Sequence, residues 1–240
     1  MQSILAIECS SHVGAVAYLP DVAQPDDGFF EVVRDTVKLS AWVVPAISRV
    51  LAQAGASKQD VQVVAFGAGP GAFTGVRTAC ATAQSLAYAW QVPLIAVDSL
   101  EALAAASSFA HVDVVLDARM NEVYSASFER LADGRARRVS DTVLSSAGAF
   151  VPRDSVVLLG SGAALVGVGK HATSRASTDE TLAAEARWAY GVARVAIAKL
   201  AVLEFTDPER AEPIYVRNKV ALTEAERAGR ADGATQPVTA

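Results

Sequence analysis

The sequence is poor in the residues that most often carry metal and redox chemistry. Its 240 residues include two cysteines and three histidines. Cys9 and Cys80 lack the spacing of a metal site and lie in apolar segments, which indicates buried thiols in a reduced, cytoplasmic protein. His12, His111 and His171 are far apart and share no spacing, so we do not expect a metalloenzyme built on one histidine site.

Long apolar runs and an excess of positive charge are also missing. No run approaches the roughly 20 residues that a membrane span needs. The first residues, MQSILAIECSS, lack the basic start of a signal peptide, so we expect a cytoplasmic protein without a membrane segment. The 21 basic and 26 acidic residues give a net charge of -5, which disfavours unaided binding to nucleic acid. A hydrophobic content of 52% provides ample material for a core.

What is present is an alternation of strand-like and helix-like segments. Alternating or continuous apolar patterns predict strands at residues 4–10, 14–20, 29–37, 61–66, 92–97, 112–119, 122–140 and 155–162. Asp133-Gly134 marks a hairpin turn within 122–140. Helical spacing predicts helices over residues 40–55, 74–90, 100–109 and 181–200. Pro45 should kink the first helix or mark its first turn.

Two predicted strands end on an acid followed by small or polar residues. ILAIE ends at Glu8 and VVLD ends at Asp117, and each opens a strand, turn and strand series. A fold of two similar halves would give this repeat. The alternative is that the repeat has no meaning, because many strands end in polar residues.

The stretch VVAFGAGPGAFTGVR, 63–77, places a glycine-rich loop between a strand and a helix. Gly67, Gly69 and Ala72 fit the dinucleotide fingerprint G-x-G-x-x-G/A. Asp98 closes the next strand, roughly where such sites place an acid for the ribose.

Other features oppose a phosphate site in this loop. About 60 residues precede it, whereas a nucleotide-binding unit usually opens with it, and Pro70 has no N–H to offer a phosphate. The helix is expected to begin with Thr74 as its N-cap, beyond the fingerprint. No lysine follows the glycines as a Walker A loop requires, and Ser161 in LGSGA is not in a nucleophile elbow. The loop is therefore interpreted as a backbone feature that shapes the start of the following helix and does not bind a phosphate.

Arg77 lies in the first turn of the following helix, where the helix dipole disfavours a positive charge. We expect it to bind a carboxylate, either of this chain or of a partner. The rest of this helix is rich in Ala, Thr and Ser, which permits another helix to pack on its outer side. Trp42, Val43, Ile47 and Val50 of the preceding helix are candidates for the same surface.

Several motifs together resemble the TsaB (YeaZ) family of the TsaD/Kae1 superfamily. They are GAGPGAFTGVRTA, AQSLA, VPLIAVDSLEALA, DARMNEVY and PIYVRN, and the resemblance runs over 4–218. It implies an α/β fold of the actin/Hsp70/sugar-kinase-like (ASKHA) class, with two RNase H-like halves whose mixed sheets are flanked by helices. The halves would be 1–104, completed by part of the C-terminal helix, and 105–220, with 221–240 a disordered tail.

The family resemblance also implies a role. Its members are non-catalytic scaffold or activator subunits that bind a TsaD homologue and work with the TsaE ATPase. The complex transfers threonylcarbamoyl to adenosine 37 of tRNAs that read ANN codons. We therefore expect no cofactor of its own, ATP/ADP and a metal in the partner subunits, contact with tRNA only through the complex, and a homodimer when the partner is absent.

The resemblance assigns residues to this role. Ser99 and Leu103 stand where the catalytic paralogue has a histidine pair, so neither catalytic residues nor a metal site are expected here. The expected partner interface comprises Trp42, Val43, Ile47, Arg77, Thr78, Ala79, Thr82 and Ser85. Glu8, Ser10 and Asp117 would mark a vestigial nucleotide cleft.

Two enzymes remain as alternatives. An ATP-dependent small-molecule kinase of the same fold would use Glu8 and Asp117 facing each other across a cleft. Glu8 replaces the usual aspartate, and the lysine-rich or Mg²⁺-binding surroundings of a working kinase are missing. A peptidase of the glycoprotease type is the other alternative.

Overall fold

The computed structural model describes residues 2–24, 27–34, 38–167 and 174–217. The predicted disordered tail, 221–240, lies outside these residues. The first sheet has five strands in the order β3-β2-β1-β4-β5. They are β1 (Ile4–Glu8), β2 (Val13–Leu19), β3 (Phe29–Arg34), β4 (Val63–Gly69) and β5 (Leu94–Asp98).

The second sheet runs in the order β11-β10-β6-β7-β8, with β9 also paired to β7. Its strands are β6 (His111–Arg119), β7 (Glu122–Arg130), β8 (Ala136–Arg138), β9 (Val143–Ser146), β10 (Val157–Leu159) and β11 (Ser174–Arg175). In the first sheet β1 pairs antiparallel with β2 and parallel with β4. In the second, β6 pairs antiparallel with β7 and parallel with β10. The two halves therefore share a topology, as the repeat of acid-ended strands suggested.

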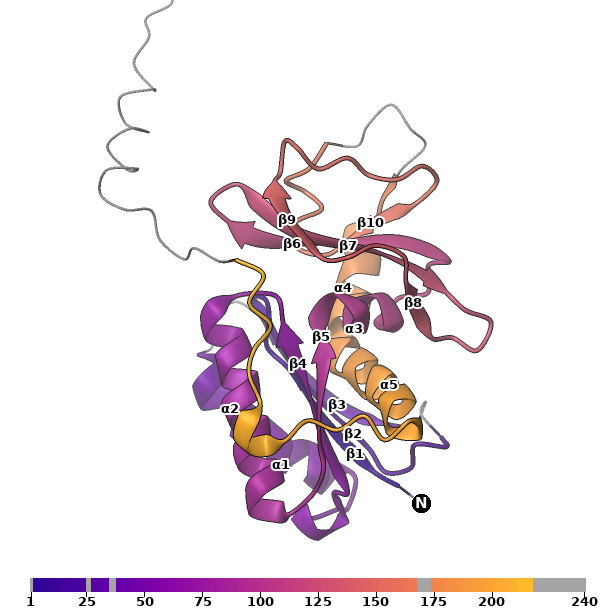
Figure 1. Cartoon of the computed structure of the whole chain (residues 1–240). Coiled ribbons are helices and arrows are strands. Elements are labelled where there is room, and N and C mark those ends of the chain that lie inside the picture. The colour runs from indigo at the N-terminus through magenta and orange to yellow at the C-terminus, as the bar shows by residue number, and fades with distance from the viewer. Residues whose placement is uncertain (1, 25–26, 35–37, 168–173, 218–240) are drawn as a thin grey trace, which may run out of the picture.

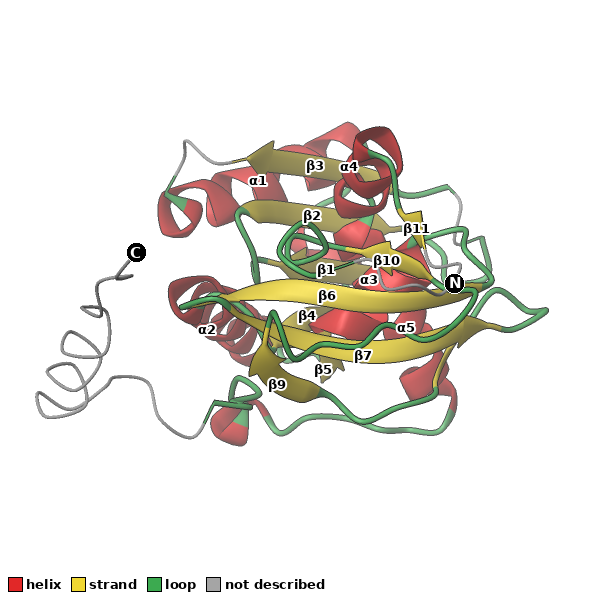
Figure 2. Cartoon of the chain, turned by 90° about the horizontal axis from the view of Figure 1, so that it is seen from above, coloured by secondary structure: helices red, strands yellow, loops and turns green. Residues whose placement is uncertain are grey.

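Helices lie on both faces of the first sheet (Figures 1 and 2). They are α1 (Leu39–Gln53), α2 (Phe73–Trp90), α3 (Ser99–Ala106), α4 (Thr178–Ala186) and α5 (Trp188–Ala201), with 3-10 turns η1 (Lys58–Asp60) and η2 (Pro208–Arg210). α1 and α2 cover one face. On the other face α5 packs on β1, β2, β4 and β5, and α3 lies between α5 and the second sheet. The predicted α/β architecture of two mixed sheets flanked by helices is confirmed.

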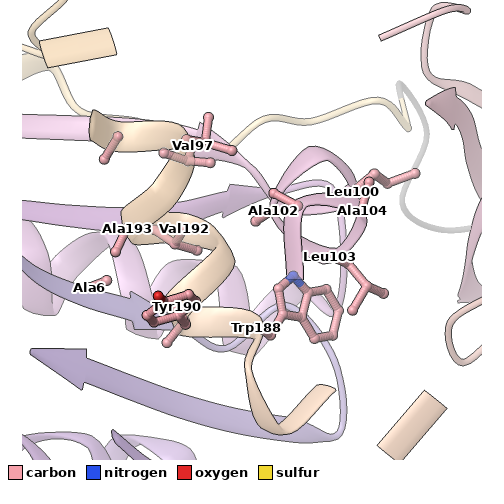
Figure 3. Packing of buried hydrophobic residues seen from close by; sticks show 14 of the residues in the cluster. Ala6, Val97, Leu100, Ala102, Leu103, Ala104, Trp188, Tyr190, Val192 and Ala193 are labelled. Carbon is pink, nitrogen blue, oxygen red and sulfur yellow. The ribbon is translucent and has the colours of Figure 1, made fainter. Parts of the chain in front are cut away.

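Alternation along β1 explains these layers, because successive side chains of a strand point to opposite faces. Ile4 and Ala6 belong to the central core with α3 and α5. Leu5 and Ile7 belong to the core beneath α1 and α2. Figure 3 shows the central core, in which Trp188 of α5 lies beside Leu103 of α3. β1 is thus buried on both faces, as expected of an inner strand with helices on each side.

Several predicted boundaries are wrong. The helix predicted over 181–200 is two helices, interrupted at Arg187, whose ψ of 11° departs from helical geometry. Strand β4 continues to Gly69, so the loop is shorter than predicted. Helix α2 begins at Phe73 with Ala72 as an N-cap that makes no side-chain bond, so Thr74 is not the cap. Pro45 lies inside α1, beyond its first turn.

Candidate functional site

The glycines of the loop let it pack against the chain between β1 and β2. A Cβ built on Gly67 would lie 1.8 Å from Oε2 of Glu8. One on Gly71 would lie 2.1 Å from the carbonyl oxygen of Ser10, and one on Gly75 would lie 1.8 Å from that of Cys9. No side chain fits at these distances. The loop therefore serves close backbone packing, as the sequence interpretation proposed.

Glu8 is fully buried beneath this loop. Its carboxylate accepts hydrogen bonds from the backbone N–H of Ser10 at 2.5 Å and from Oγ of Ser99 at 2.8 Å. Burial raises the pKa of Glu8, and the hydrogen bonds from Ser10 and Ser99 offset only part of that rise. Glu8 therefore favours its neutral form more than an exposed glutamate does.

Replacing Glu8 with glutamine should flatten the pH dependence of stability. With its pKa raised above the ordinary 4.5, Glu8 keeps its proton in the folded state where the unfolded chain has lost it. Its stabilising contribution is therefore complete below pH 4.5 and is lost as the pH rises through the raised pKa. Urea unfolding at pH 4.5 and at neutral pH should show a smaller fall in unfolding free energy for Glu8→Gln than for the parent. Glu209→Gln, at an exposed site, is the control, and an equal fall in both variants would contradict the assignment.

Ser99 and Leu103, which the family resemblance places at the paralogue's histidine positions, are both buried. Oγ of Ser99 donates to Glu8 and accepts the backbone N–H of Gly69 at 3.1 Å. Leu103 is wholly buried. Within the described residues no group of three or more His, Cys, Asp and Glu side chains is arranged to hold a metal ion.

A cavity of about 590 Å³ lies between the two halves. Ser10 and Gly71 line it from the first half, and Asp117 and Ser161 from the second. Oδ2 of Asp117 pairs with Arg119 at 3.2 Å, and the Asp117 N–H donates to Oγ of Ser161 at 3.1 Å. Two of the three residues predicted to mark a vestigial nucleotide cleft, Ser10 and Asp117, therefore line this cavity.

Glu8 does not line this cavity. Its side chain has no exposed surface, and it lies behind Ser10 against Ser99. The arrangement considered for a kinase, with Glu8 facing Asp117 across a cleft, is therefore wrong.

Asp98, which was considered as an acid that binds a ribose, has a structural role instead. Its carboxylate caps α3 by accepting the N–H groups of Leu100 and Glu101, and it pairs with Arg138 at 2.8 Å.

The C-terminal segment, 204–217, supplies cavity residues that the motif analysis missed. The Ile214 N–H donates to the Ala68 carbonyl at 2.7 Å. Arg217 donates to the carbonyl of Ala118 at 2.8 Å and pairs with Glu122 at 2.5 Å. The segment thus joins the two halves at the cavity. The motif PIYVRN was the available signal in the sequence, but a motif alone does not show that this segment lies at the cavity.

Arg77 contacts aromatic rings instead of a carboxylate of this chain. Its guanidinium carbon lies 3.7 Å from the ring centroid of Phe73, and its Nε donates to the Tyr215 hydroxyl at 2.9 Å. No ion pair of Arg77 occurs among residues 2–24, 27–34, 38–167 and 174–217. The expectation of an internal carboxylate partner is therefore wrong for this part of the chain.

The outer surface of α1 and α2 contains only part of the expected interface. Val43, Ile47 and Ala79 are buried against the first sheet, because they lie on the inner faces of their helices. The expected interface residues that keep exposed surface are Trp42, Arg77, Thr78, Thr82 and Ser85. A hollow of about 460 Å³ follows this face, lined by Ser40 of α1 and by residues of α2 that include Thr78 and Thr82. We call this face, with the five exposed residues, the α1–α2 surface.

No helix among the described residues is both long enough and apolar enough to cross a bilayer.

Comparison with known proteins identifies the family. The family model described as "TsaD: tRNA N6-adenosine threonylcarbamoyltransferase" matches residues 37–156, half of the chain. The chain is 41% identical over 92 residues to the tRNA threonylcarbamoyladenosine biosynthesis protein TsaB of Haemophilus influenzae, covering 37% of this chain and 39% of that protein. It is 32% identical over 132 residues to TsaB of Bacillus subtilis, covering 53% and 55%. The matched segments thus span between about two fifths and just over half of these relatives.

A solved structure matches over a longer range. YeaZ from Pseudomonas aeruginosa superposes with a TM-score of 0.75 at 28% identity, over 90% of this chain and all of that one. The chain therefore belongs to the TsaD family, and within it to the TsaB (YeaZ) type.

Proposed function

We propose that this chain is a non-catalytic subunit of a machinery that makes threonylcarbamoyladenosine in tRNA, and that it binds a TsaD homologue. The observation that carries the proposal is the state of Ser99 and Leu103. At the positions where the catalytic paralogue has metal-binding histidines, one side chain holds Glu8 and the other fills the core. The chain has used these positions for packing, which supports a role as scaffold.

The α1–α2 surface is the proposed binding site for the TsaD homologue. Its central residues, Thr78, Thr82 and Ser85, are small, so a partner helix can approach closely. Phe73 and Tyr88 lie at opposite ends of α2 and are 46% and 63% exposed. Aromatic residues at such positions are typical anchors of protein interfaces. In the absence of the partner, the same face would be covered by a second copy in a homodimer.

Other components complete the proposed assembly. The TsaE ATPase would join the pair, ATP/ADP and a metal would belong to the partner subunits, and tRNA would be contacted through the complex. The net charge of -5 supports this division, since binding of RNA by one subunit alone depends on positive charge.

Replacing Thr82 with arginine should disrupt the complex. A long charged side chain in the middle of the α1–α2 surface would prevent close approach of the partner helix. We expect the affinity for the host's TsaD homologue to fall by more than about tenfold, measured by calorimetry and gel filtration of the co-expressed pair. Transfer of threonylcarbamoyl to tRNA by that pair should fall in parallel.

Ser108→Arg, on an exposed loop before β6 and with no side-chain hydrogen bond to any described residue, is the control. It should leave binding and activity unchanged. If Thr82→Arg bound as tightly as the parent, the proposed surface would be wrong. If the isolated chain instead bound Mg²⁺-ATP tightly, the kinase alternative would gain support and the cavity containing Asp117 would be the place to test.

A further inference from the structure

A second cavity, of about 220 Å³, shares no residue with the cavity between the halves. Helices α3 and α5, the turn after β7 and strand β8 form its walls. Ala105, Val195 and Ala198 provide an apolar lining, and Glu101 and Arg194 line it as well. Small-molecule sites combine an apolar wall with a few polar groups, as this cavity does, and its volume lies below the usual range of about 300–1,000 Å³, so it suits only a ligand of a few heavy atoms.

Beside this cavity, two guanidinium groups lie near Gly134. Nη2 of Arg194 lies 2.6 Å, and Nη2 of Arg130 lies 3.5 Å, from the point where a Cβ on Gly134 would be. Arg130 also donates to the Ser107 carbonyl at 2.6 Å. Among the described residues no carboxylate lies within 4.0 Å of either guanidinium. Two like charges so placed favour an anion between or beside them.

The neighbouring arginines already have carboxylate partners. Arg135 pairs with Asp133 at 2.7 Å and Arg137 pairs with Glu129 at 2.5 Å. Among the described residues, Arg194 contacts instead the ring of Tyr190, whose centroid is 6.0 Å from its guanidinium carbon. The cationic character of the cavity therefore centres on Arg194.

Glu101 provides the opposite charge. Its carboxylate makes no hydrogen bond and no ion pair with any described residue. Arg138 and Lys199 act on this carboxylate from a distance, and each makes its direct ion pair elsewhere, Arg138 with Asp98 at 2.8 Å and Lys199 with Glu204 at 2.6 Å. Burial raises the pKa of Glu101, and the charges of Arg138 and Lys199 offset part of that rise.

We propose that this cavity binds a small zwitterion, an α-amino acid with a short apolar side chain. Its carboxylate would bind Arg194 and its ammonium group would bind Glu101. The short side chain would contact Ala105, Val195 and Ala198. Inorganic phosphate would give the Glu101 carboxylate no direct hydrogen-bond partner, and a simple amine would leave Arg194 without an anion, so a zwitterion satisfies both. This proposal does not depend on the proposed function.

Calorimetric titration of the full chain with L-alanine tests the proposal. We expect saturable binding, and we expect neither acetate nor methylamine alone to reproduce it. Glu101→Gln and Arg194→Gln should each weaken binding by about tenfold or more, because each removes a charge-assisted hydrogen bond. Glu209→Gln and Arg210→Gln, which change the same residue types on η2, should leave binding unchanged.

Thermal unfolding of each variant, followed by circular dichroism, checks that it is folded. Absence of alanine binding by the folded parent would overturn the proposal. Binding of inorganic phosphate that Glu101→Gln leaves unchanged would also overturn it, in favour of a plain anion site.

Discussion

Replacing Gly75 with alanine should lower the free energy of unfolding by about 3 kcal/mol, the upper part of the usual range for an overpacked core. The new Cβ would lie 1.8 Å from the carbonyl oxygen of Cys9. That oxygen is backbone, and Cys9 is fully buried between β1 and β2, so the clash cannot be relieved by rotation of a side chain. The start of α2 would have to move away from the first sheet.

Gly148→Ala is the matched control for Gly75→Ala. A Cβ at Gly148 meets nothing within 4 Å, and its φ is not positive. Since the new methyl group only restricts the unfolded chain, stability should stay within about 0.5 kcal/mol or rise slightly. Urea unfolding followed by circular dichroism gives both values. Equal losses in the two variants would show that the contact with Cys9 is not the cause.

Replacing Trp188 with alanine should cost about 3–5 kcal/mol, the range for removing a buried aromatic side chain. Trp188 has no exposed surface, and its Nε1 donates to the carbonyl oxygen of Ser99 at 2.8 Å. It packs between α5 and α3 in the central core (Figure 3). The variant would leave a cavity where the two halves meet and would deprive the Ser99 carbonyl of its donor.

Trp188→Phe separates these two effects. Phenylalanine keeps much of the apolar contact but cannot donate a hydrogen bond, so a smaller loss of about 1–3 kcal/mol is expected. Chemical unfolding of both variants gives the comparison. If the alanine variant lost no more than the phenylalanine variant, the packing of the indole would contribute little.

Much of the architecture was predictable because the strands are strongly apolar and the turns have clear signals. The predicted segments around β1, β2, β4 and β5 correspond to strands of the first sheet. The break at Arg187 was missed because the helical spacing continues across it. The start of α4, which lies before the predicted residue 181, did have a signal in the sequence, because Ser177 and Glu180 form a capping box there.

The site was less predictable, because residue type does not reveal which way a side chain points. Val43 and Ile47 are apolar, and Ala79 is small, which suits an interface as well as a core, and the structure places all three inward. Arg77 was recognised as unusual, but its aromatic partner Tyr215 is 138 residues away in sequence. The cavity with Glu101 and Arg194 is lined by residues of four separate segments, so no local sequence pattern predicts it.

The position of α5 has a consequence for synthesis of the chain on the ribosome. All five strands of the first sheet precede residue 99, but α5, which covers one of its faces, begins only at Trp188. Strands β6 to β11 and helix α4 must therefore be translated while an apolar face with Ile4, Ala6 and Val97 is not yet covered by α5. Nascent chains with such exposed surfaces are prone to aggregate and depend on chaperones. Although the two halves share a topology, the first cannot mature before the second has been made.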